Sequence, residues 1–186
     1  HRLCVSGSDR AAEKWRRDYR IPGAESLELH QLYRAMAFLG DELPAGEQED
    51  RTPFSPRCTK DLIEERLFAR RRDLFTDLQL VFLDTTSIYF EGEGGERGKH
   101  GKSKDHRPDL KQMVVAAVLD GEGTPVCCEL WPGHTADVKS LLPIVKRLRK
   151  RFGIGEVCIV ADRGMISQEA LAELADTGTN WKYILG

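Results

Sequence analysis

The chain has 186 residues, with 28 lysines and arginines against 30 aspartates and glutamates and a formal net charge of −2. This length suits one domain, or one domain with an appended segment, and the charge excludes a globally basic protein. We find neither an apolar run long enough to span a membrane nor a charged-then-apolar leader. Because the chain begins at His1 and stops at Gly186 in the middle of an apolar pattern, we expect a piece of a longer protein, cut at both ends.

Residues 1–76 have the pattern of helices joined by loops. Apolar residues at helical spacing predict three helices, within 10–21, 27–40 and 59–75. A polar segment rich in proline, glycine and acids predicts a loop at about 41–57. In the third helix we expect four apolar side chains to face inward: Leu62, Leu67, Phe68 and Phe75.

From residue 78 onward, the sequence changes to short β-branched and aromatic runs. These runs predict five strands, at 78–90, 111–120, 125–131, 156–162 and 181–185. A tight connection between the second and third strands is typical of a hairpin. Two helices are predicted between the later strands, at 134–153 and 166–176.

The order of these elements indicates the fold class. Three leading strands followed by alternating helices and strands favour an α/β fold, with a mixed five-stranded sheet and flanking helices. We expect the sheet to be antiparallel at first and parallel afterwards. In the helix at 134–153, Pro143 is tolerated only in a first turn, so the regular part is predicted to begin near Ser140. Its expected apolar face comprises Val138, Leu141, Leu142, Val145, Leu148 and Phe152.

The five cysteines are an odd number with no Cys-x-x-Cys pair. This favours neither a disulfide framework nor a zinc site, and it is typical of a reducing, cytosolic compartment. Cys127, Cys128 and Cys158 lie in apolar runs, where we expect them to pack as small hydrophobic side chains.

The first strand carries a carboxylate inside an apolar run, LVFLDTTSIYF at 80–90. We expect this strand to be buried on both faces, where a carboxylate costs several kcal/mol unless something compensates it. Two interpretations of Asp84 follow. It is either a structural aspartate, hydrogen-bonded to Thr85, Thr86 or the main chain, or a ligand of a divalent cation.

A second apolar strand ends in an aspartate, Asp162, and the carboxyl ends of strands are where α/β sheets place ligands. If the two strands are neighbours, Asp84 and Asp162 approach a common point, where they repel each other unless a cation lies between them. Carboxylate oxygens are ligands that Mg²⁺ prefers. The alternative for Asp162 is a turn or capping aspartate before the following helix.

The loop between the first two strands is rich in glycine and basic residues. Its glycines allow close backbone approach, so it is the better candidate for binding a DNA backbone by counterion release. A second basic run, KRLRKR at 146–151, is interpreted as a solvated helix face. Together with Arg163, the DNA-binding candidates are Arg97, Lys99, Lys102, Lys104, His106, Arg107 and Lys111.

Several segments of the second half resemble the DDE transposases of bacterial insertion sequences, in the group with a late Tyr-Arg-Glu-Lys signature. The segments are LDTTSIYFE, GKSKDHRPDLKQMVV, PVCCELWPGHTADVKSLLPIV, RFGIGEVCIVADRGMIS and the closing YILG. The resemblance covers roughly 78–186, and it implies an RNase-H-like catalytic core at 77–186 after a helical N-terminal region at 1–76. In such cores the first strand lies beside the fourth.

The resemblance also implies a reaction. Asp84 matches the first catalytic aspartate and Asp162 the second, and the two would hold Mg²⁺, for which Mn²⁺ can substitute. The implied activity is cleavage at the ends of an insertion sequence, followed by strand transfer into target DNA. The implied partner is double-stranded DNA, bound by a possible homodimer in the bacterial cytoplasm at the nucleoid.

One feature of the family has no counterpart in this sequence. The third catalytic acid is a glutamate far downstream, and Glu169 and Glu173 come too early to match it. We therefore expect a truncated chain that binds Mg²⁺ weakly and cuts DNA poorly or not at all. Two alternatives stay open: a non-catalytic DNA-binding remnant of a transposase, and an unrelated RNase-H-like metal-dependent nuclease.

Overall fold

The computed structural model describes most of the chain. The described residues are 5, 7–49, 51, 56–71, 80–104, 106–136, 139–154, 158–161, 165, 167–168, 171–172 and 182–185. Most of the predicted helix at 166–176 lies outside these residues, as do Phe75 and Val138.

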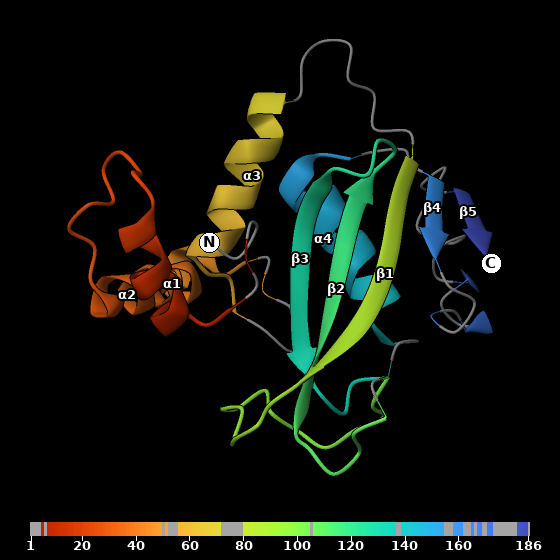
Figure 1. Ribbon diagram of the computed structural model, residues 1–186. Helices are drawn as coiled ribbons and strands as arrows, with labels where there is room; N and C mark the ends of the chain where they lie inside the picture. The colour runs from red at the N-terminus through yellow and green to blue at the C-terminus, as the bar shows by residue number, and fades with distance from the viewer. Residues whose placement is uncertain are drawn as a thin grey trace.

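A five-stranded mixed sheet forms the centre of the structure (Figure 1). Its strands are β1 (Leu80–Tyr89), β2 (Gln112–Asp120), β3 (Pro125–Pro132), β4 (Cys158–Ala161) and β5 (Lys182–Leu185), in the order β3-β2-β1-β4-β5. β2 pairs antiparallel with β1 and β3, whereas β4 pairs parallel with β1 and β5. The predicted switch from antiparallel to parallel pairing is confirmed, and so is the position of the first strand beside the fourth.

The two faces of β1 differ, which corrects the expectation that this strand is buried on both. Side chains along the strand alternate between buried and exposed, as in a sheet with one face packed on the core. The buried members are Val81, Leu83, Thr85 and Ser87. Asp84 lies on the other face and is exposed. The prediction of burial on both faces was wrong because the exposed face also carries large apolar residues, among them Phe82 and Ile88.

Helix α4 (Leu141–Phe152) packs on the buried face of the sheet. Figure 1 shows it behind β1, β2 and β3. The helix begins after Ser140, as predicted, and ends at Gly153 in the left-handed conformation that glycine adopts without a Cβ penalty. Its predicted apolar face is confirmed for the described members: Leu142 is partly buried, and Leu141, Val145, Leu148 and Phe152 are buried.

The cysteines that the described residues include are free. Cys127 is buried, and burial raises the pKa of its thiol far above the ordinary value. Cys128 and Cys158 are half-buried in β3 and β4. The expected packing of these three residues as small side chains within strands therefore holds best for Cys127.

Three helices form the N-terminal region, as predicted. They are α1 (Asp9–Trp15), α2 (Leu29–Gly40) and α3 (Thr59–Arg71), and two short 3-10 helices follow α1 and α2, at Arg16–Asp18 and Ala45–Glu47. Ser8 caps α1, and Glu28 and Gln31 form a capping box at the start of α2. In Figure 1, α1 and α2 lie beside α3, on the side of the molecule away from β4 and β5.

The inward face of α3 differs from the predicted one. Phe68 is buried against Phe152 of α4, with ring centroids 5.0 Å apart, and Leu62 is half-buried. Leu67, however, is 55% exposed. The prediction was wrong for Leu67 because α3 turns a charged side, not a continuous apolar stripe, toward β3 and α4. The division of the chain at residue 77 stays a prediction.

Candidate functional site

Asp84 lies in the middle of β1, on the exposed face of the sheet. Its Oδ1 accepts a hydrogen bond from the main-chain N–H of Thr85 at 2.7 Å. This is the contact that the structural interpretation of Asp84 required. It occupies one carboxylate oxygen, and Oδ2 accepts no hydrogen bond from any residue in the described part of the chain, so the side chain keeps an oxygen that can bind a cation.

The pairing of β1 with β4 places Asp84 next to the last described residue of β4. The two strands run parallel, and Leu83 is the register partner of Ala161. Asp84 is the next residue of β1. Asp162 is the next residue of the sequence after β4 but, like Arg163, lies outside the described residues. Glu169 and Glu173 also lie outside them.

Within the described ranges, no group of three or more His, Cys, Asp or Glu side chains converges in a way that could hold a metal ion. Asp84 nevertheless fits a hard divalent cation, because it is an exposed carboxylate with one oxygen already oriented by a main-chain N–H.

The loop that follows β1 is clamped at its base. Lys99 and Gln112 exchange two main-chain hydrogen bonds, of 3.0 and 2.9 Å. The Gln112 side chain is buried, and its Nε2 donates to the carbonyl oxygens of Lys102, at 3.0 Å, and Gly133, at 3.1 Å. A Cβ at Gly101 or Gly133 would collide with main-chain atoms. The glycines therefore serve close packing of this loop against the start of β2 and the turn after β3.

The basic residues of the loop fall into two groups. Four already interact with the protein. Arg107 binds Asp109 through two hydrogen bonds of 3.0 and 2.9 Å, Lys111 pairs with Glu93, and Lys104 binds Thr85. The fourth is Arg97, which is half-buried and lines a cavity of about 340 Å³ between α2, α3, β3 and α4. By contrast, Lys99, Lys102 and His106 are exposed and form no ion pair with the described residues.

These pairs alter the titration of exposed acids. A hydrogen bond from Lys111 lowers the pKa of Glu93, and one from Arg107 lowers the pKa of Asp109. Both carboxylates are ionised at neutral pH, as exposed acids normally are, and they neutralise part of the positive charge of the loop. The exposed ammonium groups of Lys99 and Lys102 are therefore the best remaining contacts of this loop for an anion.

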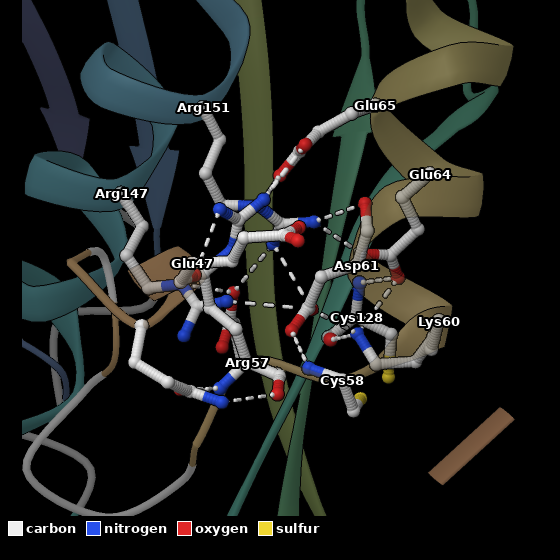
Figure 2. A network of polar contacts seen from close by, with 12 residues as sticks. Glu47, Arg57, Cys58, Lys60, Asp61, Glu64, Glu65, Cys128, Arg147 and Arg151 are labelled. Atoms are coloured by element: carbon white, nitrogen blue, oxygen red, sulfur yellow. Dashed lines mark hydrogen bonds and ion pairs between the residues drawn. The ribbon is translucent and has the colours of Figure 1, made fainter. Parts of the chain in front are cut away.

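A buried cluster of charged residues, which the sequence pattern did not predict, joins α3, β3 and α4 (Figure 2). The prediction that 146–151 is a solvated face was wrong for two of its arginines. The Arg151 side chain is 0% exposed and the Arg147 side chain 7% exposed. The residues of the cluster are Arg57, Lys60, Asp61, Glu64, Glu65, Glu129, Arg147 and Arg151.

Arg151 is at the centre of this cluster. Its Nε donates to Glu65 Oε1 at 2.7 Å, and its Nη2 donates to Glu64 Oε2 and to the Asp61 carbonyl oxygen, both at 2.9 Å. Its Nη1 contacts Glu129 Oε1 at 3.2 Å. Each nitrogen of the guanidinium thus has an acceptor from α3 or β3, which is the condition for a buried charge to be tolerated.

The same cluster covers the outer edge of the sheet. β3 is an edge strand, and an edge strand exposes unpaired main-chain groups. Here Lys60 Nζ donates to the Cys128 carbonyl oxygen at 2.7 Å, and the Cys128 N–H donates to Glu64 Oε1 at 2.9 Å. Side chains of α3 therefore take the place of a further strand.

Acid should weaken the ion pairs that Asp61 forms with Lys60 and Arg151. Burial opposes the ionisation of Asp61, but the nearby Lys60 and Arg151 outweigh burial and lower the pKa of its carboxyl group. Because the unfolded chain has the higher pKa, it binds more protons in the acidic range, so the stabilisation is fully present above about pH 4 and is lost as pH falls through the folded-state pKa. Urea unfolding between neutral and strongly acidic pH should show this loss, and Asp61→Asn should reduce it. An unchanged acid limb in Asp61→Asn would contradict this assignment.

Strand order, strand directions and the helix on one face together define an RNase-H-like α/β fold. The family model for the transposase DDE domain matches residues 76–185, and the chain belongs to this family.

Among solved structures, the chain is similar to a Mos1 transposase paired-end complex with the left transposon end, at 15% identity and a TM-score of 0.37, over 95% of this chain and 58% of that one. The catalytic domain of Mos1 mariner transposase is similar at 16% identity and a TM-score of 0.39, over 76% and 61% of the two chains. The chain therefore spans less than two thirds of either protein. A comparison with curated protein sequences finds no match. No helix among the described residues is long and apolar enough to cross a membrane.

Proposed function

We propose that the chain carries part of the active site of a DNA transposase, in which Asp84 and Asp162 together bind a divalent cation at a phosphodiester. The observation that supports this proposal is the pairing of Leu83 with Ala161 in adjacent parallel strands. Asp84 and Asp162 are the next residues of the two segments, each at the carboxyl-terminal side of a paired residue.

The chemistry follows from the donor set. Carboxylate oxygens select hard cations, so the proposed ion is Mg²⁺, with Mn²⁺ as a substitute. Such ions, when bound, polarise the phosphodiester and lower the cost of charge on the attacking and leaving oxygens. The contribution of Asp84 is its position, because the Thr85 N–H holds one oxygen of a carboxylate that lies on the exposed face of the sheet.

The proposed partner is double-stranded DNA. Exposed cations at Lys99 and Lys102 lie on a clamped loop that follows β1, and they can release counterions from a DNA backbone. Arg163 is included because it follows Asp162 in the sequence. The same proposal includes a homodimer on paired DNA ends, an insertion-sequence substrate of the Tyr-Arg-Glu-Lys group and action at a bacterial nucleoid.

A purified sample of this chain tests the proposal with a supercoiled plasmid and Mg²⁺. Because no third carboxylate joins Asp84 among the described residues, we expect weak metal binding and nicking at or near the background rate. Any nicking above background should disappear in Asp84→Ala. Strong nicking that persists in Asp84→Ala would contradict the role of Asp84. Strong nicking that Asp84→Ala abolishes would support that role and contradict the expected weak activity of this chain.

A further inference from the structure

Two polar residues interrupt the buried face of β1. Val81 and Leu83 continue the apolar core, but Thr85 and Ser87, further along the same face, are only 3% and 6% exposed. A buried hydroxyl is costly unless it is hydrogen-bonded. Both hydroxyls bind the same residue, Lys104, which lies 19 residues after Thr85 in the loop that follows the strand.

Lys104 contacts β1 through its main chain and its side chain. Its main-chain N–H donates to Ser87 Oγ at 3.0 Å. Its ammonium group donates to the Thr85 carbonyl oxygen at 2.5 Å and to Thr85 Oγ1 at 3.0 Å. Hydrogen bonds from a charged donor are the stronger class, and removing the donor would leave the buried Thr85 hydroxyl without it.

Thr85, the residue that Lys104 binds, also orients Asp84. The Thr85 N–H donates to Asp84 Oδ1, and the Thr85 carbonyl oxygen accepts from Lys104. One residue thus connects the candidate metal ligand to the basic loop.

The loop is therefore fastened at two points. Gln112 holds the carbonyl oxygen of Lys102 at the base, and Thr85 and Ser87 hold Lys104 two residues later. Between these points Lys102 projects an exposed ammonium group that forms no ion pair with the described residues. The same short segment thus contains two exposed lysines: the ammonium group of Lys104 is bound to β1, whereas that of Lys102 makes no such contact.

We propose that Lys104 is a positioning residue: it fixes the loop after β1, and the open cation of Lys102, relative to Asp84, and it does not itself contact DNA. The anchoring part of this proposal rests only on the contacts with β1. The part that concerns DNA rests on the proposed function.

Amide hydrogen exchange of the DNA-free chain tests the anchor. Lys104→Met keeps the aliphatic stem and removes the ammonium group, and Lys102→Met is the matched control. Loss of a charge-assisted hydrogen bond should speed exchange of the amides at 99–104 by about tenfold or more in Lys104→Met. The control should stay within about twofold of the wild type, because its side chain makes no such bond. Equal exchange in the two variants would overturn the anchor.

Thr85→Val keeps the test decisive if Lys104→Met fails to fold. It removes one acceptor of the ammonium group and leaves the carbonyl acceptor in place. We expect the amides at 99–104 to exchange faster in Thr85→Val than in the wild type. The double variant Thr85→Val, Lys104→Arg should exchange no faster than Thr85→Val alone, because arginine can still donate to the Thr85 carbonyl oxygen. Wild-type exchange in Thr85→Val would overturn the contribution of its hydroxyl to the anchor.

Salt dependence of binding to a mixed-sequence DNA duplex separates the two lysines. Removing a phosphate contact lowers the slope of log affinity against log salt concentration by about 1. We expect this change in Lys102→Met, whereas Lys104→Met should weaken binding with the slope preserved. A reduced slope in Lys104→Met, with exchange unchanged, would make Lys104 a DNA contact and overturn the proposal. Absence of DNA binding in the wild type would refute the proposed function and leave the exchange result standing.

Discussion

Arg151→Met is expected to lower the free energy of unfolding by about 3–5 kcal/mol, the range for breaking a buried ion pair by removing one partner. The guanidinium contacts Glu64, Glu65 and Glu129 at 3.2 Å or less, and its side chain is 0% exposed. Methionine fills a similar volume but leaves those carboxylates without their shared cation. Urea unfolding followed by tryptophan fluorescence measures the loss.

Arg149→Met provides the control, because Arg149 lies on the same helix and is exposed. Its effect should stay within about 0.5 kcal/mol, as for most surface substitutions. If Arg151→Met lowered the free energy of unfolding no more than Arg149→Met does, the cluster would contribute little to stability.

Asp84→Asn is expected to abolish Mn²⁺ binding by the chain. The substitution keeps the size of the side chain and an oxygen that can accept from the Thr85 N–H, but it removes the negative charge that holds the cation. Even residues that only orient a metal ligand cost about 10–100-fold in affinity when they are changed, so loss of a direct ligand should bring weak binding below detection. Paramagnetic resonance of free Mn²⁺ in a titration reports the bound fraction.

Glu122→Gln is a suitable control for this titration, since it removes one exposed negative charge in the hairpin between β2 and β3. It should bind Mn²⁺ as the wild type does. Equal binding by Asp84→Asn and the wild type would place the cation elsewhere, and a wild type that binds no Mn²⁺ at millimolar concentration would argue against a two-acid site.

Much of the sheet could be predicted from the sequence. Strands were recognised from β-branched runs, and α4 from apolar residues such as Leu141, Val145 and Leu148 on one face. These are local patterns, and each follows from the period of one element. The position of β1 beside β4 is not local, and it came only from the family resemblance.

The buried charges could not be predicted in the same way. Arg147 and Arg151 have the same spacing as solvated residues on a helix, and only the packing of α3 against α4 makes them buried. One signal was available: Glu129 lies between Cys127 and Trp131 at inward positions of β3, and a carboxylate at such a position calls for a buried cation.

The physical reason for singling out Asp84 was wrong, and its role in a metal site stays a prediction. Asp84 was noticed because a buried carboxylate is costly, yet it is exposed. The polar residues that are buried are its neighbours Thr85 and Ser87, which the sequence analysis did not connect with Lys104. Contacts of a loop with a strand 19 residues away leave no periodic pattern in the sequence.

Anomalous diffraction from crystals of the chain soaked in Mn²⁺ would locate the cation itself. Two acids that share one ion should give a peak about 2.0–2.6 Å from a carboxylate oxygen of Asp84 and at a similar distance from Asp162. Side chains that point to opposite faces of the sheet, or a peak that contacts neither residue, would contradict the shared site and with it the proposed chemistry.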